Sequence, residues 1–149
     1  SMRLNASTDY AIRLILYLAK ESKIVSSSKL SSSIGISPRY LLQIGSKLRK
    51  AGVVDAVHGA TGGYKLIMSP SAITLYDIVA IMEKGSVGTG VNPACETQPF
   101  RFPLLKTAYQ YTNDVLARIL KSITVESLLT QRFDEWYLAP CLLNQSQEK

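Results

Sequence analysis

One helix ends and another begins within residues 35–38, and this junction limits the possible folds more than any other feature of the sequence. Gly35 follows a short segment with helical spacing of its apolar residues, at a position where glycine commonly ends a helix. Ser37 and Pro38 are residue types preferred at the N-cap and at the first position of a new helix. So short a connection predicts a helix-turn-helix.

Apolar residues at helical spacing predict the helices around this junction. Residues 6–20 carry such a stripe, with Ser7 as the expected N-cap. Residues 26–33 are rich in serine, but their paired apolar positions favour a short capped helix over a flexible linker. The helix that begins at Pro38 runs to the glycine at position 52 and has a basic and polar face opposite its apolar face.

A β-ribbon is predicted after the helix-turn-helix. Residues 53–57 and 64–68 are short β-prone runs, and the glycine-rich segment between them, residues 58–63, is too long for a two-residue hairpin turn. Two helices followed by a ribbon with a protruding tip are typical of a winged helix-turn-helix. The predicted fold class is therefore mainly α with a small β-ribbon.

The second half of the chain is predicted to be helical apart from one loop. Thr74 is the expected N-cap of the first helix in this half, and Thr124 of the last. Residues 85–103 hold several glycines and prolines without a sustained period, which indicates an exposed loop. Residues 104–122 form a long helix with an apolar surface too broad for one packing partner.

The composition is that of a globular protein with a basic surface. Of 149 residues, 46% are hydrophobic and 19% are charged, which allows a sizeable core. The formal net charge of +6 favours a polyanionic partner, although many basic proteins bind no nucleic acid. No stretch approaches the roughly 20 apolar residues of a membrane span, and no signal peptide is visible. We therefore expect a cytoplasmic protein whose two cysteines are reduced thiols.

The polar face of the second helix of the motif has the chemistry to read DNA. A helix fits the major groove, where Gln43 can bond an adenine edge and Arg39 or Lys47 can reach guanine or a phosphate. Ser28 and Ser37 lie near helix N-termini and offer donors to phosphate oxygens. The alternatives are a solvated polar face for the long side chains and plain N-capping for the serines.

The tip of the ribbon provides a second candidate contact. His58 is suited to a minor groove or a phosphate, and the glycines on both sides of Thr61 allow the backbone to approach DNA closely. The alternative is a mobile loop whose glycines only satisfy the backbone geometry of the turn.

Four segments of the sequence resemble the Rrf family of winged-helix regulators, namely MRLNASTDYAIRLILYLA, ISPRYLLQIGSKLRKAGVVDAVHGATGGYKL, ITLYDIVAIME and ILKSITVESLL. That family includes the iron-sulfur cluster assembly regulator, the nitric-oxide-sensitive repressor and the cysteine metabolism repressor. The likeness covers residues 2–130, and its second segment is highly specific. It implies a homodimer made through the helix at residues 104–122, which represses at a palindromic operator of double-stranded DNA.

The resemblance also supports DNA contacts at several of the positions discussed above. The predicted DNA contacts are Ser28, Ser37, Pro38, Arg39, Tyr40, Gln43, Lys47, His58, Gly59 and Thr61. The chain is accordingly divided into a winged DNA-binding domain at residues 2–84, a sensor-type loop at residues 85–103, dimerisation helices at residues 104–131 and a tail at residues 132–149.

Two departures from the family limit what it implies. Members that hold an iron-sulfur cluster place three cysteines in the loop before the long helix, whereas this loop has only Cys95, and the distant Cys141 cannot complete four ligands from one chain. We therefore expect no cofactor and no metal. His58 stands where arginine is common, and Leu42 stands where some members carry an acidic specificity residue, so the operator sequence cannot be inferred from theirs.

Cys95 remains the candidate sensor. A lone thiol in an exposed loop can be oxidised, and a disulfide to the partner chain or to Cys141 would strain the dimer. The alternatives are an inert remnant of a lost cluster site, a small-molecule effector or a partner protein.

A dimeric, cluster-free, sequence-specific transcriptional regulator, acting as a repressor, is the function that these patterns favour. The second hypothesis is a winged helix that binds protein instead of DNA, which would lack the salt dependence of phosphate contacts. With one histidine, no nucleophile-base pair and no phosphate loop, the sequence offers no machinery for an enzyme.

Overall fold

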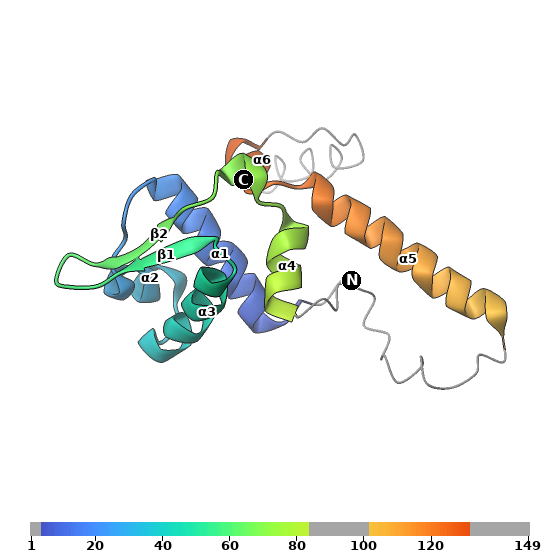
Figure 1. Cartoon of the computed structure of the whole chain (residues 1–149), viewed down its shortest axis with the longest axis horizontal. Coiled ribbons are helices and arrows are strands. Elements are labelled where there is room, and N and C mark those ends of the chain that lie inside the picture. Colours follow the sequence, from blue (N-terminus) through green and yellow to red (C-terminus); the bar gives the residue numbers. More distant parts are fainter. Residues whose placement is uncertain (1–3, 84–101, 132–149) are drawn as a thin grey trace, which may run out of the picture.

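The computed structural model describes residues 4–83 and 102–131. The first stretch begins with three helices, α1 (Ala6–Glu21), α2 (Ser27–Ile34) and α3 (Pro38–Lys50). It continues with strands β1 (Val54–Val57) and β2 (Gly63–Leu66), the 3-10 helix η1 (Pro70–Ala72) and α4 (Leu75–Glu83). The second stretch contains α5 (Pro103–Ser122) and α6 (Val125–Thr130). This order confirms the predicted winged helix-turn-helix, mainly α with a small ribbon (Figure 1).

Capping residues account for the turn between α2 and α3. Ser26 and Ser37 each accept a hydrogen bond from a backbone N–H in the first turn of the helix that follows. Gly35 ends α2 with a φ of 79°, a left-handed conformation that glycine adopts without steric cost. Pro38 occupies the first turn of α3, where its missing N–H is no loss. The helix-turn-helix therefore forms as its local residue types predict.

The start of α1 corrects the sequence-based prediction. Its N-cap is Asn5 and not Ser7, which lies inside the first turn. The Asn5 side chain makes no capping bond. Instead, the Glu83 carboxylate at the end of α4 accepts hydrogen bonds from the Asn5 backbone nitrogen at 3.3 Å and from the Thr8 hydroxyl at 3.0 Å. A carboxylate from a distant helix thus ties the start of α1 to α4.

A third backbone segment pairs with the wing, close to its tip. β1 and β2 are antiparallel, with Val57 opposite Gly63, so β2 begins at Gly63 and not at the predicted residue 64. Val25, between α1 and α2, pairs with Tyr64 through two backbone hydrogen bonds of 2.9 Å. The segment before α2 therefore holds the ribbon beside its tip, and only the tip itself projects beyond the helix-turn-helix (Figure 1).

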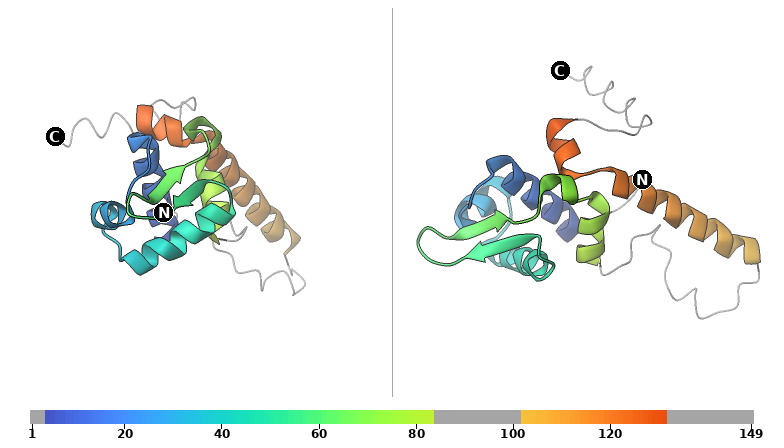
Figure 2. Two further views of the ribbon diagram at one scale, coloured as in Figure 1. Left: turned by 60° about the vertical axis from the view of Figure 1, so that its left-hand side comes forward. Right: turned by 45° about the horizontal axis from the view of Figure 1, so that its top comes forward.

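One hydrophobic core connects the helices of the two described stretches. Leu14 of α1, Leu41 of α3 and Ile78 of α4 are fully buried in it. Val125 of α6 belongs to the same core, and its backbone nitrogen donates to the Ile73 carbonyl at 2.9 Å. Figure 2 shows α6 close to α1 and η1, so this last helix packs on the winged domain.

Helix α5 extends away from this core (Figures 1 and 2). Only Leu120, near its end, is buried, and Lys121 Nζ lies 4.5 Å from the centre of the Tyr76 ring of α4. Within residues 4–83 and 102–131, no helix has the length and hydropathy needed to span a membrane. The apolar side chains towards the start of α5 are instead exposed to solvent, including Leu104 at 82% and Tyr111 at 70%. Among the described residues of one chain, an apolar face of α5 is therefore left uncovered.

Replacement of a buried serine in α2 is expected to raise stability. Ser31 is 8% exposed, and its Oγ has no hydrogen-bond partner in the described part of the chain. A buried hydroxyl without a partner costs about 1–3 kcal/mol. We expect Ser31→Ala to raise the free energy of unfolding by about 1 kcal/mol in urea denaturation. Ser32→Ala is the control, because Ser32 is exposed and its Oγ donates to the Lys29 carbonyl. Equal gains in both variants would contradict this interpretation.

Candidate nucleic-acid interface

The outer face of α3 is a row of polar and basic side chains. Leu41, Ile44 and Leu48 are buried on the inner side of the helix. Arg39, Gln43 and Lys47 follow one another at every fourth position and are exposed to solvent. The ionisable side chains on the exposed parts of α3 are all basic: Arg39, Lys47, Arg49 and Lys50. We call the exposed row of Arg39, Gln43 and Lys47 the recognition face. Its positive charge attracts a polyanion.

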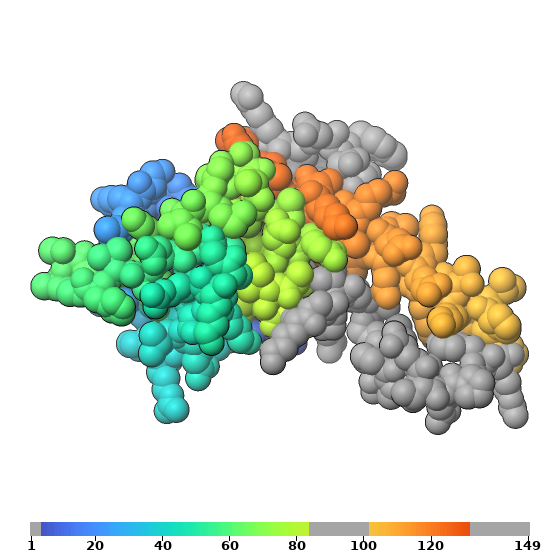
Figure 3. All heavy atoms as spheres, in the orientation of Figure 1, coloured from blue at the N-terminus to red at the C-terminus, as the bar shows by residue number. Residues whose placement is uncertain are grey.

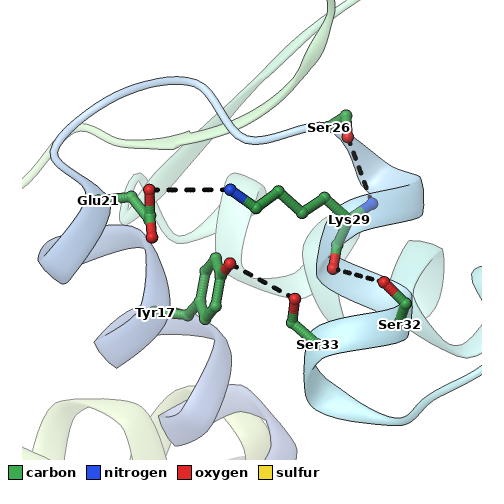
Figure 4. Close-up of polar contacts among 6 residues, drawn as sticks. All are labelled: Tyr17, Glu21, Ser26, Lys29, Ser32 and Ser33. Carbon is green, nitrogen blue, oxygen red and sulfur yellow. Dashed lines mark hydrogen bonds and ion pairs between the residues drawn. The ribbon is translucent and has the colours of Figure 1, made fainter.

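The serines predicted to meet phosphates lie near helix starts that are open to solvent. Ser37 is the exposed N-cap of α3, and Ser28 is exposed in the first turn of α2. The cap of α2 is Ser26, whose Oγ lies 3.4 Å from that of Ser28. Lys29, in the same turn, extends towards Glu21 of α1, with its Nζ 4.0 Å from Oε2 (Figure 4).

Tyr40 is the predicted DNA contact whose side chain is engaged inside the protein. It is half-buried, and its ring meets that of Tyr10 edge-on, with centroids 5.7 Å apart and an interplanar angle of 82°. This contact anchors α3 to α1. Tyr40 therefore has a packing role, and its contact with DNA stays a prediction.

The wing lies beside α3 and carries its predicted contacts at its tip. His58, Gly59 and Thr61 are all exposed at the tip. Figure 3 shows α3 and the wing as neighbouring parts of one side of the molecule, away from α5. Arg49 Nε of α3 lies 4.0 Å from Asp55 Oδ1 of β1, which adds a polar link between the two elements. The fold thus brings together the two groups of residues that the sequence predicts as DNA contacts.

An open groove of about 700 Å³ runs along the recognition face. It is lined by residues of α1, α3 and α4, namely Ser7, Tyr40, Leu42, Gln43, Ile44, Ser46, Lys47, Lys50 and Met82. Leu42, Ser46 and Lys50 are exposed there, although they were not among the predicted contacts. Helical spacing could have predicted two of them, because positions 46 and 50 lie on the same face of the helix as Gln43 and Lys47.

The family to which the chain belongs is shown by a match over most of its length. Residues 4–131 match the model of the Rrf2 family, described as an iron-dependent transcriptional regulator. The chain belongs to the Rrf2 family. It is thus a transcriptional regulator with a DNA-binding winged-helix fold and not an enzyme, as the sequence predicts.

Two curated proteins illustrate the similarity in sequence to this Rrf2-family regulator. HTH-type transcriptional regulator IscR of Vibrio cholerae serotype O1 is 33% identical over 130 residues, which are 86% of this chain and 75% of that protein. Protein aau3 of Rhizobium meliloti is 36% identical over 83 residues, which are 55% of this chain and 54% of that protein. The match therefore spans about half the length of aau3 and most of IscR.

Solved structures share the fold. CymR, the global cysteine regulator of B. subtilis, is 28% identical with a TM-score of 0.74, covering 89% of this chain and 99% of its own. IscR of T. potens is 25% identical with a TM-score of 0.70, covering 93% of this chain and 97% of its own.

The donor residues of this Rrf2-family chain do not fit an iron-sulfur cluster held by one subunit. Such clusters are bound mostly by four cysteine thiolates. The sequence has two cysteines, Cys95 and Cys141, which both lie outside the described residues. Among residues 4–83 and 102–131, no three His, Cys, Asp or Glu side chains are grouped so that they could hold a metal ion. The two cysteines therefore fall short of the four thiolates that such a cluster takes.

Proposed function

We propose that this regulator is a homodimeric repressor that binds a palindromic operator in double-stranded DNA. The observation that carries the proposal is the exposed recognition face of α3 next to a wing whose tip is exposed. The uncovered apolar face of α5 supports the dimer. A two-fold dimer presents two recognition helices to half-sites about one DNA turn apart, which is the reason for a palindromic target.

Each part of the surface has a distinct task in this proposal. Gln43 in the major groove forms a bidentate contact with an adenine edge, whereas Lys47 at the next turn contacts a phosphate. The N-terminus of α3 at Ser37 contacts a second phosphate through its backbone dipole. The wing tip at His58 contacts the flanking minor groove or its backbone. Sequence specificity thus comes from α3, whereas α3 and the wing both contribute to the affinity for DNA.

A winged helix that binds a protein partner is the alternative function. The charged side chains on α3 are all basic, which favours DNA. Binding of the full chain to a random-sequence duplex library, repeated at rising salt, separates the two. Phosphate contacts make the logarithm of the binding constant fall linearly with the logarithm of the salt concentration. Failure to enrich any duplex at low salt would refute the proposed DNA binding.

Two substitutions on the recognition face are expected to differ in kind. Gln43→Ala should weaken binding to the enriched operator by about 1–3 kcal/mol per half-site and leave random DNA unaffected, because base contacts specify sequence. Lys47→Ala should weaken both and reduce the salt slope by about 1 per half-site, because phosphate contacts are indifferent to sequence. Fluorescence anisotropy with operator and scrambled duplexes at several salt concentrations measures both effects.

Lys20→Ala is the matched control for this pair. Lys20 is exposed in the last turn of α1 and does not line the groove along α3. Its removal lowers the net charge as Lys47→Ala does but should leave the salt slope nearly unchanged. If Gln43→Ala and Lys47→Ala weaken operator and scrambled DNA equally, the assignment of the recognition face is wrong.

We also propose that the regulator responds to thiol oxidation through Cys95, with a small ligand as the alternative signal. The motivation is the sequence, in which this thiol precedes α5. Diamide treatment is expected to change the operator affinity of the parent protein but not of Cys95→Ser. An equal change in both proteins would exclude Cys95 as the sensor.

A cluster shared between two subunits is tested separately. Anaerobic reconstitution with iron and sulfide, followed by visible absorbance, shows whether two chains together supply four thiolates.

A further inference from the structure

The ring of Tyr64 occupies the space next to a glycine in the middle of α3. A Cβ atom built on Gly45 would lie 2.7 Å from Cε1, Cζ and the hydroxyl oxygen of Tyr64, which is closer than real Cβ atoms approach their neighbours. Both residues are buried, and Tyr64 is 6% exposed. Because Tyr64 lies on β2, two positions after the wing tip ends at Gly62, its ring acts as a spacer between the recognition helix and the wing.

The strand that carries Tyr64 is fixed on its other side. The backbone nitrogen and oxygen of Tyr64 both pair with Val25 at 2.9 Å. Next to them, a Cβ on Gly63 would lie 2.0 Å from the Val25 carbonyl oxygen, which shows how closely the two segments approach. The backbone that carries the ring is therefore held in place, and the ring can yield to α3 only by turning about its own side-chain torsions within the core.

The ion pair between Arg49 of α3 and Asp55 of the ribbon is weak. Arg49 and Asp55 are 4.0 Å apart, and their side chains are 56% and 47% exposed, so solvent screens the pair. Burial raises the pKa of the Tyr64 phenol, and the nearby Arg49 lowers it. Because a tyrosine with a raised pKa is neutral at physiological pH, the contact with Gly45 is one of shape and not of charge.

We propose that Tyr64 and Gly45 are positioning residues that set the wing against the recognition helix, so that both engage one duplex together. This inference rests on the proposed DNA binding and goes beyond it, because neither buried residue forms part of the exposed face. A winged helix grips DNA through a helix in the major groove and a wing at the flanking groove. A displaced wing loses the flanking contacts while the helix contacts remain.

Gly45→Ala tests the spacing directly, because the added methyl group pushes against the Tyr64 ring. The probe is the operator enriched from the random duplex library with the unmodified full chain. We expect about a ten-fold or greater loss of operator affinity, as several wing contacts disappear together. Hydroxyl-radical footprinting should show lost protection at the operator flanks and retained protection in the half-site centres. Helix propensity cannot explain the loss, since alanine favours helices over glycine.

Tyr64→Leu and the double variant Gly45→Ala/Tyr64→Leu test the same contact from the side of the tyrosine. Leucine lacks the atoms that approach Gly45, so Tyr64→Leu alone leaves the wing without its spacer and should also lose flank protection. This variant keeps the proposal testable if Gly45→Ala folds poorly. In Gly45→Ala/Tyr64→Leu the alanine methyl fills part of the space, and flank protection and affinity should recover towards the parent, beyond the sum of the single effects.

Thermal unfolding of each variant separates positioning from simple stability. The proposal is overturned if Gly45→Ala and Tyr64→Leu melt at lower temperature while the folded proteins keep the parent footprint and affinity. It is also overturned if the double variant binds no better than the weaker single variant. A parent chain that enriches no duplex refutes the proposed DNA binding instead.

Discussion

A Gly63→Ala variant is expected to lose a large part of its stability. The new Cβ would lie 2.0 Å from the backbone oxygen of Val25, and backbone cannot rotate away as a side chain can. Relief of the clash separates β2 from Val25 and breaks the two hydrogen bonds that Val25 makes with Tyr64. The buried side chains of both residues are then exposed. We expect the free energy of unfolding to fall by about 4 kcal/mol.

Such a loss is a large fraction of the total stability of a typical domain, so it should be plain in thermal unfolding followed by circular dichroism, with a fall in Tm of roughly 15 °C. Gly59→Ala is the control. Gly59 has a φ of 108° and open space around its Cβ position, so the change adds backbone strain at the wing tip without a clash. Equal falls in Tm for the two variants would contradict a role for the contact with Val25.

Signals between near neighbours in the sequence predicted most of the fold. Thr74 and Asp77 illustrate this, because each backbone nitrogen donates to the side chain of the other residue, at 2.9 and 3.1 Å. Thr124 begins α6 with the same reciprocal arrangement. Such caps depend on residues within one helical turn, so residue types at fixed spacing are sufficient to find them.

Contacts between distant residues could not be predicted in this way. Glu83 binds the start of α1 from more than seventy positions away, and the N-cap is Asn5 instead of the predicted Ser7. Val25 pairs with Tyr64, although its segment shows no strand pattern. In both cases tertiary packing brings the partners together, and the local propensities of the residues do not predict the contact.

The exposed row of the site followed from helical periodicity alone, because burial of Leu41, Ile44 and Leu48 forces Gln43 and Lys47 outward. Periodicity did not reveal that Tyr40 packs on Tyr10, since an aromatic ring at the border of a face can turn either way. Cys95 lies outside the described residues, so its role stays a prediction.

A Leu105→Glu variant is expected to dissociate the proposed dimer. Leu105 is 41% exposed in the single chain and belongs to the uncovered apolar stripe of α5. A two-fold interface contains the substitution twice. If each unpaired carboxylate costs about 2 kcal/mol on burial, the dissociation constant of the dimer rises by about a thousand-fold. Sedimentation equilibrium over a range of protein concentrations measures this change.

The effect on the operator should exceed that of any single DNA contact, because two linked half-sites gain about 10²–10⁴ in avidity over one. Gln110→Glu adds the same charge to the same helix, on an exposed position about 140° around the axis from Leu105. It should leave both the dimer and operator binding intact. If Leu105→Glu stays dimeric, another surface joins the subunits. If the parent protein is a monomer at micromolar concentration, the proposed dimer is wrong, and with it the argument for a palindromic operator.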